Sequence, residues 1–256
     1  MAGKPEGRRQ KAESRRAARG GMGSSSHQSR VASHGYFVTG TDTGVGKTLI
    51  ACALLKAFAA RGLTTVGMKP VASGAERRGA ALVNHDVEQL TASGNVAAPP
   101  EHVNPYCFEP AVAPHIAARR AGARIELDRI ERSHRVLRGL AQVVIVEGVG
   151  GFRVPLGADA DMAHLAARLG LPVVLVVGLR LGCLNHALLT AEAVTARGLA
   201  LAGWVANQID PGMAEVEANI EALRLGIGAP LLARIAYAEA PDPASIGAGF
   251  DLKLLK

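Results

Sequence analysis

Apolar runs of strand length alternate along this chain with segments in which apolar residues recur at helical spacing. The apolar runs predict strands over 36–39, 64–68, 143–146, 173–177, 203–206 and 231–235. The helically spaced segments predict helices over 48–60, 87–93, 114–121, 127–139, 162–169, 185–197 and 213–225. Continuous Val, Ile and Leu in the strands indicate burial on both faces, as in a parallel sheet. The sequence therefore predicts an α/β fold: a doubly wound, mostly parallel sheet with helices on both faces.

Length and charge predict one domain behind a basic tail. The chain has 256 residues, of which 48% are hydrophobic, and this suffices for one core. Residues 1–33 hold eight of the 29 basic and two of the 22 acidic residues, a charge of +6 that leaves +1 for the rest. Because this tail has almost nothing to bury, we expect 1–33 to be disordered and 34–256 to form a single domain. Within the domain, the four prolines of 94–112 predict a long surface excursion.

Composition also excludes several classes of protein. The apolar runs are far shorter than the roughly 20 residues of a membrane span, and no signal-peptide core follows the first methionine. The nearly neutral body offers no basic surface for nucleic acid. Cys52, Cys107 and Cys183 lack the spacing of a zinc site, and we expect no disulfide among them. We therefore expect a cytoplasmic protein with no nucleic-acid partner and no membrane partner.

The most informative segment is 36–48, in which an apolar strand is followed by a glycine-spaced loop and then by Gly-Lys-Thr at a helix start. That order places backbone N–H groups, one ammonium and one hydroxyl around a polyphosphate, with the hydroxyl able to reach Mg²⁺. The outer glycine stands one place early, at Gly40, so the loop is a longer variant of the phosphate loop, and Gly44 eases its curl. The segment predicts a nucleotide site, and the nucleotide we expect is ATP.

Two further strands end in residues suited to phosphoryl chemistry. Lys69 precedes Pro70, which keeps the lysine extended, so its ammonium would neutralise a transferring phosphoryl group or lie at the surface. Glu147 ends a buried strand, where a carboxylate needs a cation, and with Thr48 it would give Mg²⁺ two hard oxygen ligands. Asp86 either joins this metal site or N-caps the helix that is predicted from residue 87.

Two later segments each leave two alternatives open. Residues 178–186 link a buried strand to a helix whose first N–H groups would suit a carboxylate, or they form an ordinary connection with Asn185 as the cap. Asn207, at the end of another strand, either reads an adenine edge or caps a turn.

Together these segments resemble the dethiobiotin synthetase family. The matching stretches run in the family's order and cover 36–48, 69–74, 103–106, 114–116, 146–151, 176–190 and 202–207. They contain GTDTGVGKT at 40–48, KPVASG at 69–74, VEGVGG at 146–151, LGCLNHALLT at 181–190 and GWVAN at 203–207. They are very specific as a set, and the similarity extends from residue 35 to about residue 237.

The resemblance implies an ATP-dependent ring closure of 7,8-diaminononanoate with CO₂ to dethiobiotin, ADP and phosphate. One amine becomes a carbamate, ATP converts the carbamate into a carbamic-phosphoric anhydride, and the second amine closes the ring. Such chemistry needs positioning and charge neutralisation more than covalent help from the protein. The resemblance also implies Mg²⁺ and a homodimer with the substrate across the interface.

The family's functional residues fall on named positions of this sequence. Lys47 would hold the β- and γ-phosphates, Lys69 would contact the carbamate and the γ-phosphoryl group, and Thr43 and Ser73 would bind the amine or carbamate end; these four form the implied catalytic set. The implied ATP site comprises Gly44, Val45, Gly46, Lys47, Thr48 and, as the adenine reader, Asn207. The implied Mg²⁺ ligands are Thr48, Asp86 and Glu147. The implied substrate site comprises Thr43, Lys69, Ser73, Gly148, Gly182, Cys183, Leu184, Asn185 and, with a loose alignment, Asn219.

The sequence departs from the family at a few positions, and two other functions share its architecture. Arg180 stands where a lysine is common, and Ala236 replaces a usual proline beside the expected adenine loop, which puts base selectivity in doubt. An amide-forming synthase of the cobyrinate type usually carries a glutaminase domain, and we expect none here. A partitioning ATPase places a lysine early in its phosphate loop, where this chain has Thr41.

Overall fold

The computed structural model describes residues 34–255. The predicted disordered tail over 1–33 lies outside the described residues, and the single domain over 34–256 stays a prediction. The main sheet has six strands in the order β10-β9-β8-β1-β7-β2, and every neighbouring pair in it is parallel. Its strands are β1 (His34–Gly40), β2 (Thr65–Met68), β7 (Val143–Gly151), β8 (Val173–Leu179), β9 (Leu201–Gln208) and β10 (Leu231–Ile235).

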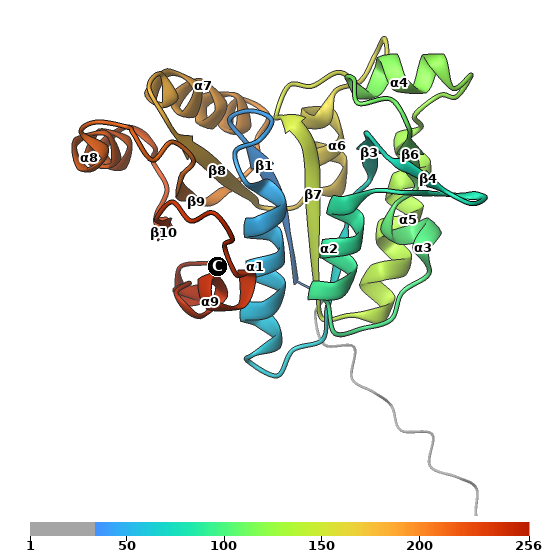
Figure 1. Ribbon diagram of the computed structural model, residues 1–256, viewed down its shortest axis with the longest axis horizontal. Helices are drawn as coiled ribbons and strands as arrows, with labels where there is room; N and C mark the ends of the chain where they lie inside the picture. The colour runs from blue at the N-terminus through green and yellow to red at the C-terminus, as the bar shows by residue number, and fades with distance from the viewer. Residues whose placement is uncertain (1–33, 256) are drawn as a thin grey trace, which may run out of the picture. The chain divides into compact units, whose positions relative to one another are not determined.

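Helices cover both faces of this sheet (Figure 1). One face carries α1 (Lys47–Ala59), α2 (His85–Ser93) and α9 (Pro243–Ala248), whereas the other carries α5 (Leu127–Leu140), α6 (Met162–Leu169), α7 (Cys183–Ala196) and α8 (Val216–Gly226). Successive strand residues alternate between the two cores: Phe37 packs with α5 and α6, and its neighbour Val38 packs with α1. The predicted doubly wound parallel fold is confirmed.

The strand order reverses direction at β1. The chain leaves β1 for the edge strand β2, returns through β7, and then continues on the other side of β1 through β8, β9 and β10. In an open α/β sheet such a reversal opens a crevice beyond the carboxyl ends of the strands, and ligands bind there. The loop after β1, which carries the phosphate-loop motif, lies at this point (Figure 1).

The surface excursion predicted over 94–112 contains two short elements and the buried apolar residues Val103, Tyr106 and Phe108. This stretch contains a short helix, α3 (Pro100–Val103), and a strand, β6 (Tyr106–Phe108), which pairs in parallel with β3 (Val71–Ser73). The prolines are compatible with this structure because Pro100 occupies the first turn of α3, where no intrahelical N–H bond is lost. The other elements away from the main sheet are β4 (Glu76–Arg78), β5 (Ala81–Val83), α4 (Pro114–Arg120) and the 3₁₀ turn Leu252–Leu254.

A helix begins earlier than predicted where its N-cap residue precedes the apolar residues from which the helix was predicted. Helix α7 begins at Cys183, two residues before the predicted start, because Gly182 takes a left-handed conformation (φ 93°) as its N-cap. Asn185 is therefore inside the first turn and is not the cap that the ordinary reading assigned to it. Across residues 34–255, no helix combines the length and the apolar character that a bilayer crossing requires.

Candidate active site

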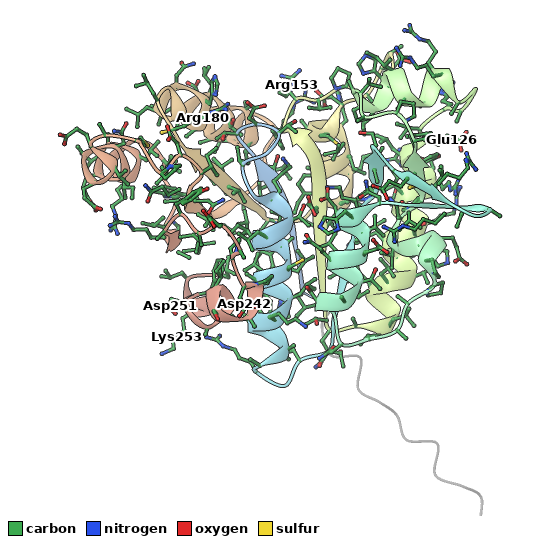
Figure 2. The ribbon with its side chains drawn as sticks, viewed as in Figure 1. Glu126, Arg153, Arg180, Asp242, Asp251 and Lys253 are labelled. Carbon is green, nitrogen blue, oxygen red and sulfur yellow. The ribbon has the colours of Figure 1, made fainter. Side chains whose placement is uncertain are left out.

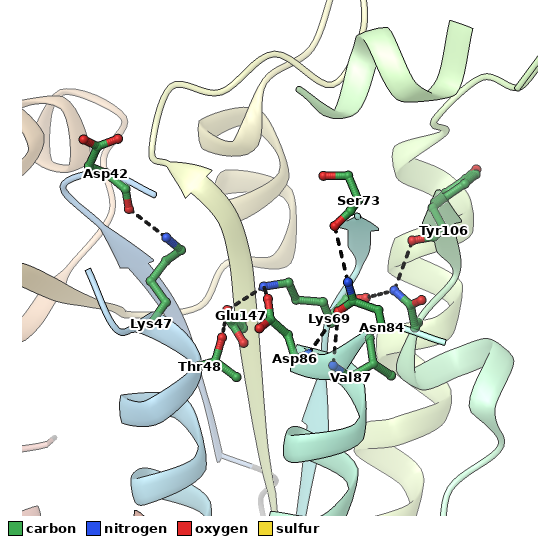
Figure 3. A network of polar contacts seen from close by, with 11 residues as sticks. Asp42, Lys47, Thr48, Lys69, Ser73, Asn84, Asp86, Val87, Tyr106 and Glu147 are labelled. Carbon is green, nitrogen blue, oxygen red and sulfur yellow. Dashed lines mark hydrogen bonds and ion pairs between the residues drawn. The ribbon is translucent and has the colours of Figure 1, made fainter. Parts of the chain in front are cut away.

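A cavity of about 680 Å³ lies at the carboxyl ends of the central strands. Nine of its lining residues were predicted from the sequence to bind the nucleotide, the metal or the reacting end of the substrate. They are Thr43, Gly44, Gly46, Lys47, Thr48, Lys69, Ser73, Asp86 and Glu147. Figure 3 shows Lys47 and Thr48 at the start of α1, Lys69 after β2, Asp86 on α2 and Glu147 on β7. Residues separated by as many as 104 positions in sequence therefore meet in one hollow.

The phosphate loop curls as its glycines require. Gly46 has φ 90° and is the N-cap of α1, and a Cβ at that position would collide with the amide nitrogen of Asn207. Gly44 also has a positive φ, 76°, but a Cβ there would meet open space. The ammonium of Lys47 donates to the backbone oxygen of Asp42 over 2.8 Å. The side chain of Lys47, which would hold a phosphate, thus bridges the two ends of the phosphate loop.

Lys69 is the centre of a buried charge cluster. Its Nζ lies 2.5 Å from Glu147 Oε1 and 2.9 Å from Asp86 Oδ2. The same Glu147 oxygen accepts a hydrogen bond of 2.8 Å from the hydroxyl of Thr48. The side chains of Lys69 and Glu147 are only 4% and 1% exposed. Figure 3 shows the four chain segments that these contacts join: α1, the end of β2, α2 and β7.

Backbone contacts fix the position of Lys69 directly after β2. Its N–H donates to the carbonyl of Val103, and its own carbonyl accepts from the Asn104 side chain over 2.6 Å. Asn104 also donates to the carbonyl of Tyr106 in β6, so the strand end is tied to the excursion. The sequence reasoning gave Asn104 no role. Its signal was membership of 103–106, one of the stretches in which the sequence resembles the family.

Asp86 is not the N-cap of its helix. Asn84 holds that position, since its side chain accepts from the N–H groups of Asp86 and Val87. Helix α2 therefore starts at His85, two residues before the predicted start, and the carboxylate of Asp86 is left to contact Lys69. Of the two alternatives, capping is the one that the structure contradicts. Asn84 is a second residue that the sequence reasoning missed.

Glu147 lies inside β7 and does not end it, because β7 continues to Gly151. The register explains how a carboxylate in mid-strand can still line the cavity. Strand β2 pairs with β7 only as far as Met68 opposite Val146, so the neighbour on that side stops one residue before Glu147. The side chain therefore opens toward the crevice while its backbone pairs with Val38 of β1.

The electrostatics differ between the two lysines. Burial, together with the nearby charge of Lys69, lowers the pKa of Lys47 to about 8. Burial also opposes the charge on Lys69, but attraction by Glu147 and Asp86 outweighs it and raises the pKa of Lys69. Burial of Asp86 is likewise outweighed by Lys69, which lowers the pKa of that carboxyl. The cluster is therefore an ion-paired set at neutral pH.

The donor set at this place fits a hard divalent cation. Thr48, Asp86 and Glu147 present only oxygen ligands to the cavity, as Mg²⁺ prefers. Glu147 Oε2 is buried and has no hydrogen-bond partner among residues 34–255, so one oxygen is left for a ligand. Within the same residues, no three His, Cys, Asp or Glu side chains cluster to hold a metal by themselves. Such a site would need oxygen atoms from elsewhere, and nucleotide phosphates commonly supply them to Mg²⁺.

Sequence reasoning gave no role to most of the apolar cavity wall. The residues of 111–114 form one side, and Val149 and Val154 form another, beside Gly150. These side chains are small or apolar, so they carry no chemical signal in a single sequence. They make the hollow partly apolar, as an aliphatic substrate would require.

Asn207 lines a second, smaller cavity of about 190 Å³ behind the phosphate loop. Its side-chain nitrogen donates to the carbonyl of Val45 over 2.9 Å, and the residue is only 6% exposed. Leu49, Ala236 and Tyr237 lie around the same space. Asn207 thus holds the loop in place, and its oxygen is the side-chain atom that remains for a base. Val45 itself is buried and contributes its carbonyl to this contact.

The remaining predicted substrate residues do not line the main cavity. Gly148 faces the core, where a Cβ would lie 3.3 Å from both Met162 and the ring of Phe37. Gly182, Cys183, Leu184 and Asn185 form the start of α7, and Asn219 lies in α8. The resemblance assigned the last five to a substrate bound by a partner subunit, so a single chain leaves their roles as predictions.

A second ion pair ties the phosphate loop to the connection before α7. Arg180 donates to Asp42 Oδ2 over 2.6 Å, and the N–H of Thr43 donates to Asp42 Oδ1 over 2.7 Å. The hydrogen bond from Thr43 and the pairing with Arg180 lower the pKa of Asp42 despite slight burial. Arg180 lies on the exposed rim of the molecule (Figure 2). The lysine that is common at this position could make the same ion pair with a single donor group.

Comparison with solved structures agrees with this architecture. A ParA family ATPase from Chlorobium tepidum matches with a TM-score of 0.52 at 14% identity, covering 87% of this chain and 93% of that one. The septum site-determining protein MinD from Pyrococcus horikoshii, solved with Mg-ADP, matches with a TM-score of 0.51 at 15% identity, covering 85% and 93%. At such identity the likeness concerns the fold alone.

Sequence comparison is more specific. A family model described as an AAA domain matches residues 34–245. The ATP-dependent dethiobiotin synthetase BioD of Aromatoleum aromaticum is 53% identical over 217 residues, which cover 85% of this chain and 96% of the relative. The enzyme of the same name from Nitrosospira multiformis is 53% identical over 218 residues, covering 85% and 95%. With this identity along nearly the whole length of both relatives, the chain belongs to the dethiobiotin synthetase family.

Proposed function

We propose that this protein is a dethiobiotin synthetase, which makes dethiobiotin, ADP and phosphate from 7,8-diaminononanoate, CO₂ and ATP. One observation carries the proposal: two ammonium groups and two carboxylates converge with a hydroxyl on one cavity beside the phosphate loop. Family membership at 53% identity supports the same conclusion.

The reaction proceeds in three balanced steps. An amine of the substrate adds to CO₂ and loses a proton, giving a carbamate. A carbamate oxygen then attacks the γ-phosphorus of ATP, the bond to the bridging oxygen breaks, and ADP leaves. Finally the second amine attacks the carbamate carbon and loses a proton, the C–O bond to the phosphate breaks, and the five-membered urea ring closes.

The chain's own groups are suited to the charges in these steps. Lys47 extends from the first turn of α1 and would hold the β- and γ-phosphates, while Lys69 would neutralise the carbamate and the transferring phosphoryl group. Thr43 and Ser73 line the same cavity and would hydrogen-bond the reacting end of the diamine. The apolar wall at 111–114 would limit the water that reaches a mixed anhydride once the substrates fill the cavity.

Thr48, Asp86 and Glu147 would hold Mg²⁺ at this site. When bound, the ion neutralises negative charge on the phosphate oxygens. The buried, unpartnered oxygen of Glu147 and the purely oxygen donor set support this assignment.

We also propose a cytoplasmic homodimer in which Gly182–Asn185 and Asn219 receive the carboxylate tail of the partner's substrate. In support, the first N–H groups of the 14-residue helix α7 have no partner inside the helix, although that of Cys183 donates to the carbonyl of Arg180. The adjacent Leu181 is 96% exposed, as an interface residue in an isolated chain would be.

The test is the dependence of ATP turnover on the other substrates. Purified protein is expected to form ADP and dethiobiotin in equal amounts, and only when the diamine and bicarbonate are both present. Brisk ATP hydrolysis without the diamine, or acceleration by DNA or lipid, would instead indicate a nucleotide-switched ATPase of the kind whose fold this chain shares.

A further inference from the structure

The ammonium of Lys69 occupies the place between the two carboxylates that a metal ion would need. Its distances to Glu147 Oε1 and Asp86 Oδ2 are 2.5 and 2.9 Å. The Glu147 oxygen that it contacts is also the one bonded to the hydroxyl of Thr48, the third proposed ligand. Lys69 therefore contacts two of the three proposed ligands directly, and the third is bonded to one of the same oxygens, while Glu147 Oε2 stays unpartnered.

A divalent ion bound to either oxygen of Glu147 would lie close to this ammonium. Mg²⁺ binds its ligands at about 2.0–2.1 Å, so an ion on the Glu147 carboxylate would stand within a few ångströms of a buried positive charge. Repulsion between like charges is strong where water is excluded, and Lys69 is 3% exposed. Either the ion stays away or the lysine leaves the carboxylates.

Lys69 can leave the two carboxylates only when another negative charge enters the cavity and pairs with its ammonium. Lys47 is the second cation on the cavity wall and is bonded to a neutral carbonyl, so Lys47, Lys69, Asp86 and Glu147 sum to zero charge. A nucleotide adds several negative charges beside Lys69, while its metal ion satisfies the two carboxylates. The exchange keeps every charge paired, whereas entry of the ion alone would not.

We propose that Lys69 is an internal counter-ion that closes the metal site of the free protein and makes divalent-cation binding depend on a phosphate-bearing ligand. The lysine then moves from Glu147 and Asp86 to the phosphate, which is where the reaction needs it. The inference rests on the proposed function only in taking that ligand to be ATP.

The experiment measures binding of Mn²⁺, without nucleotide, by the loss of its free electron paramagnetic resonance signal. Wild-type protein is expected to bind weakly, and Lys69→Met is expected to bind roughly tenfold or more tightly, because the carboxylates lose their resident cation. The matched control is Lys56→Met, which removes an equal charge from α1 at a lysine that contacts the carbonyl of Ala92. It is expected to bind as weakly as the wild type.

A double variant identifies the site. Adding Glu147→Gln to Lys69→Met is expected to abolish the gain in Mn²⁺ affinity. If Lys69→Met does not fold, Lys69→Gln, which keeps donor groups without the charge, replaces it. Equal Mn²⁺ affinity in the wild type and in a folded Lys69 variant would overturn the proposal, as would tight binding by the free wild type.

The result is separable from the proposed function, because the titration contains neither diamine nor ATP. Failure of dethiobiotin synthesis combined with the expected Mn²⁺ pattern would overturn the enzyme assignment and leave the counter-ion role intact.

Discussion

The phosphate loop lies between two ion pairs that have similar geometry and very different surroundings. On one side, Lys69 meets Glu147 at 2.5 Å, with side chains that are 4% and 1% exposed. On the other, Arg180 meets Asp42 at 2.6 Å, with side chains that are 43% and 47% exposed. The first pair is held without water, whereas the second is hydrated and screened. Distance alone thus says little about what either pair contributes, and burial decides it.

The largest effect is expected from the buried side. Lys69→Met should lower turnover by roughly 10³-fold or more, because the transferring phosphoryl group loses its positive partner in a water-excluded site. Steady-state kinetics with saturating ATP and diamine measures the loss. Lys56→Met serves as the control and should keep wild-type rates. Near-wild-type turnover by a folded Lys69→Met variant would remove this residue from the mechanism.

The phosphate loop lies between the two ion pairs, and its glycines should differ in how well they tolerate substitution by alanine. Gly46→Ala should abolish ATP binding, because a methyl group there strains a residue at φ 90° and collides with Asn207. Gly44→Ala has the same kind of backbone strain at φ 76° but meets open space, so it should lower the free energy of unfolding by only about 1–2 kcal/mol and retain ATP binding. Calorimetric titration with ATP distinguishes the two. Equal behaviour would mean that the contact with Asn207 does not hold the loop.

The buried side chain of His134 forms no ion pair within the described residues, and it shows what burial does to an ionisable group without a partner. His134 in α5 is 5% exposed, and its Nε2 has no hydrogen-bond partner within residues 34–255. Burial, with the charge of Arg138 added and that of Glu131 opposing, lowers its pKa from 6.5 to about 4. Between these two values the unfolded chain takes up a proton that the folded protein does not, so stability is complete above pH 6.5 and falls as the pH drops toward 4.

This difference predicts an acid-sensitive stability. From pH 7 to pH 5 His134 should cost the folded protein about 2 kcal/mol. Urea unfolding at both pH values measures the loss in the wild type and in His134→Gln, and the difference between the two proteins isolates the histidine. If both lose the same stability on acidification, His134 is not held neutral by the fold.

The smallest effect is expected at the exposed pair. Arg180→Ala should lower the free energy of unfolding by less than about 1 kcal/mol and turnover by less than roughly fivefold, and added salt should diminish both effects. Arg180→Lys, which keeps the charge, should be indistinguishable from the wild type. A loss at Arg180 as large as that at Lys69 would break the comparison, because burial would then not be what separates the two pairs.

Much of the fold was predictable because its signals are local. Continuous apolar runs marked the six strands of the main sheet, and the phosphate-loop motif marked where the strand order reverses. The short elements α3 and β6 were missed because neither has enough residues to show a period. Helix starts were missed at Asn84 and Gly182, where the cap stands outside the apolar pattern.

The candidate site was predictable as a set of residues and not as a set of contacts. Strand ends and the family resemblance identified Lys69 and Glu147, but their contact joins positions 78 apart in sequence. No feature of the neighbouring sequence indicated that Lys69 would pair with Glu147 and Asp86, or that Asn104 would bond to the backbone of Lys69. Contacts of this kind depend on how the strands align, and a single sequence does not reveal strand register.

The most direct test of the proposed chemistry follows one oxygen atom. In brief reactions with bicarbonate labelled with oxygen-18 in ordinary water, the carbamate oxygen that attacks the γ-phosphorus must remain on the phosphate when the ring closes. Mass spectrometry of the products is therefore expected to show phosphate that carries label from bicarbonate, in proportion to the dethiobiotin formed. Unlabelled phosphate accompanying ADP would show that water attacks ATP in this cavity, and it would contradict the assignment of Lys47 and Lys69 to a carbamate phosphorylation.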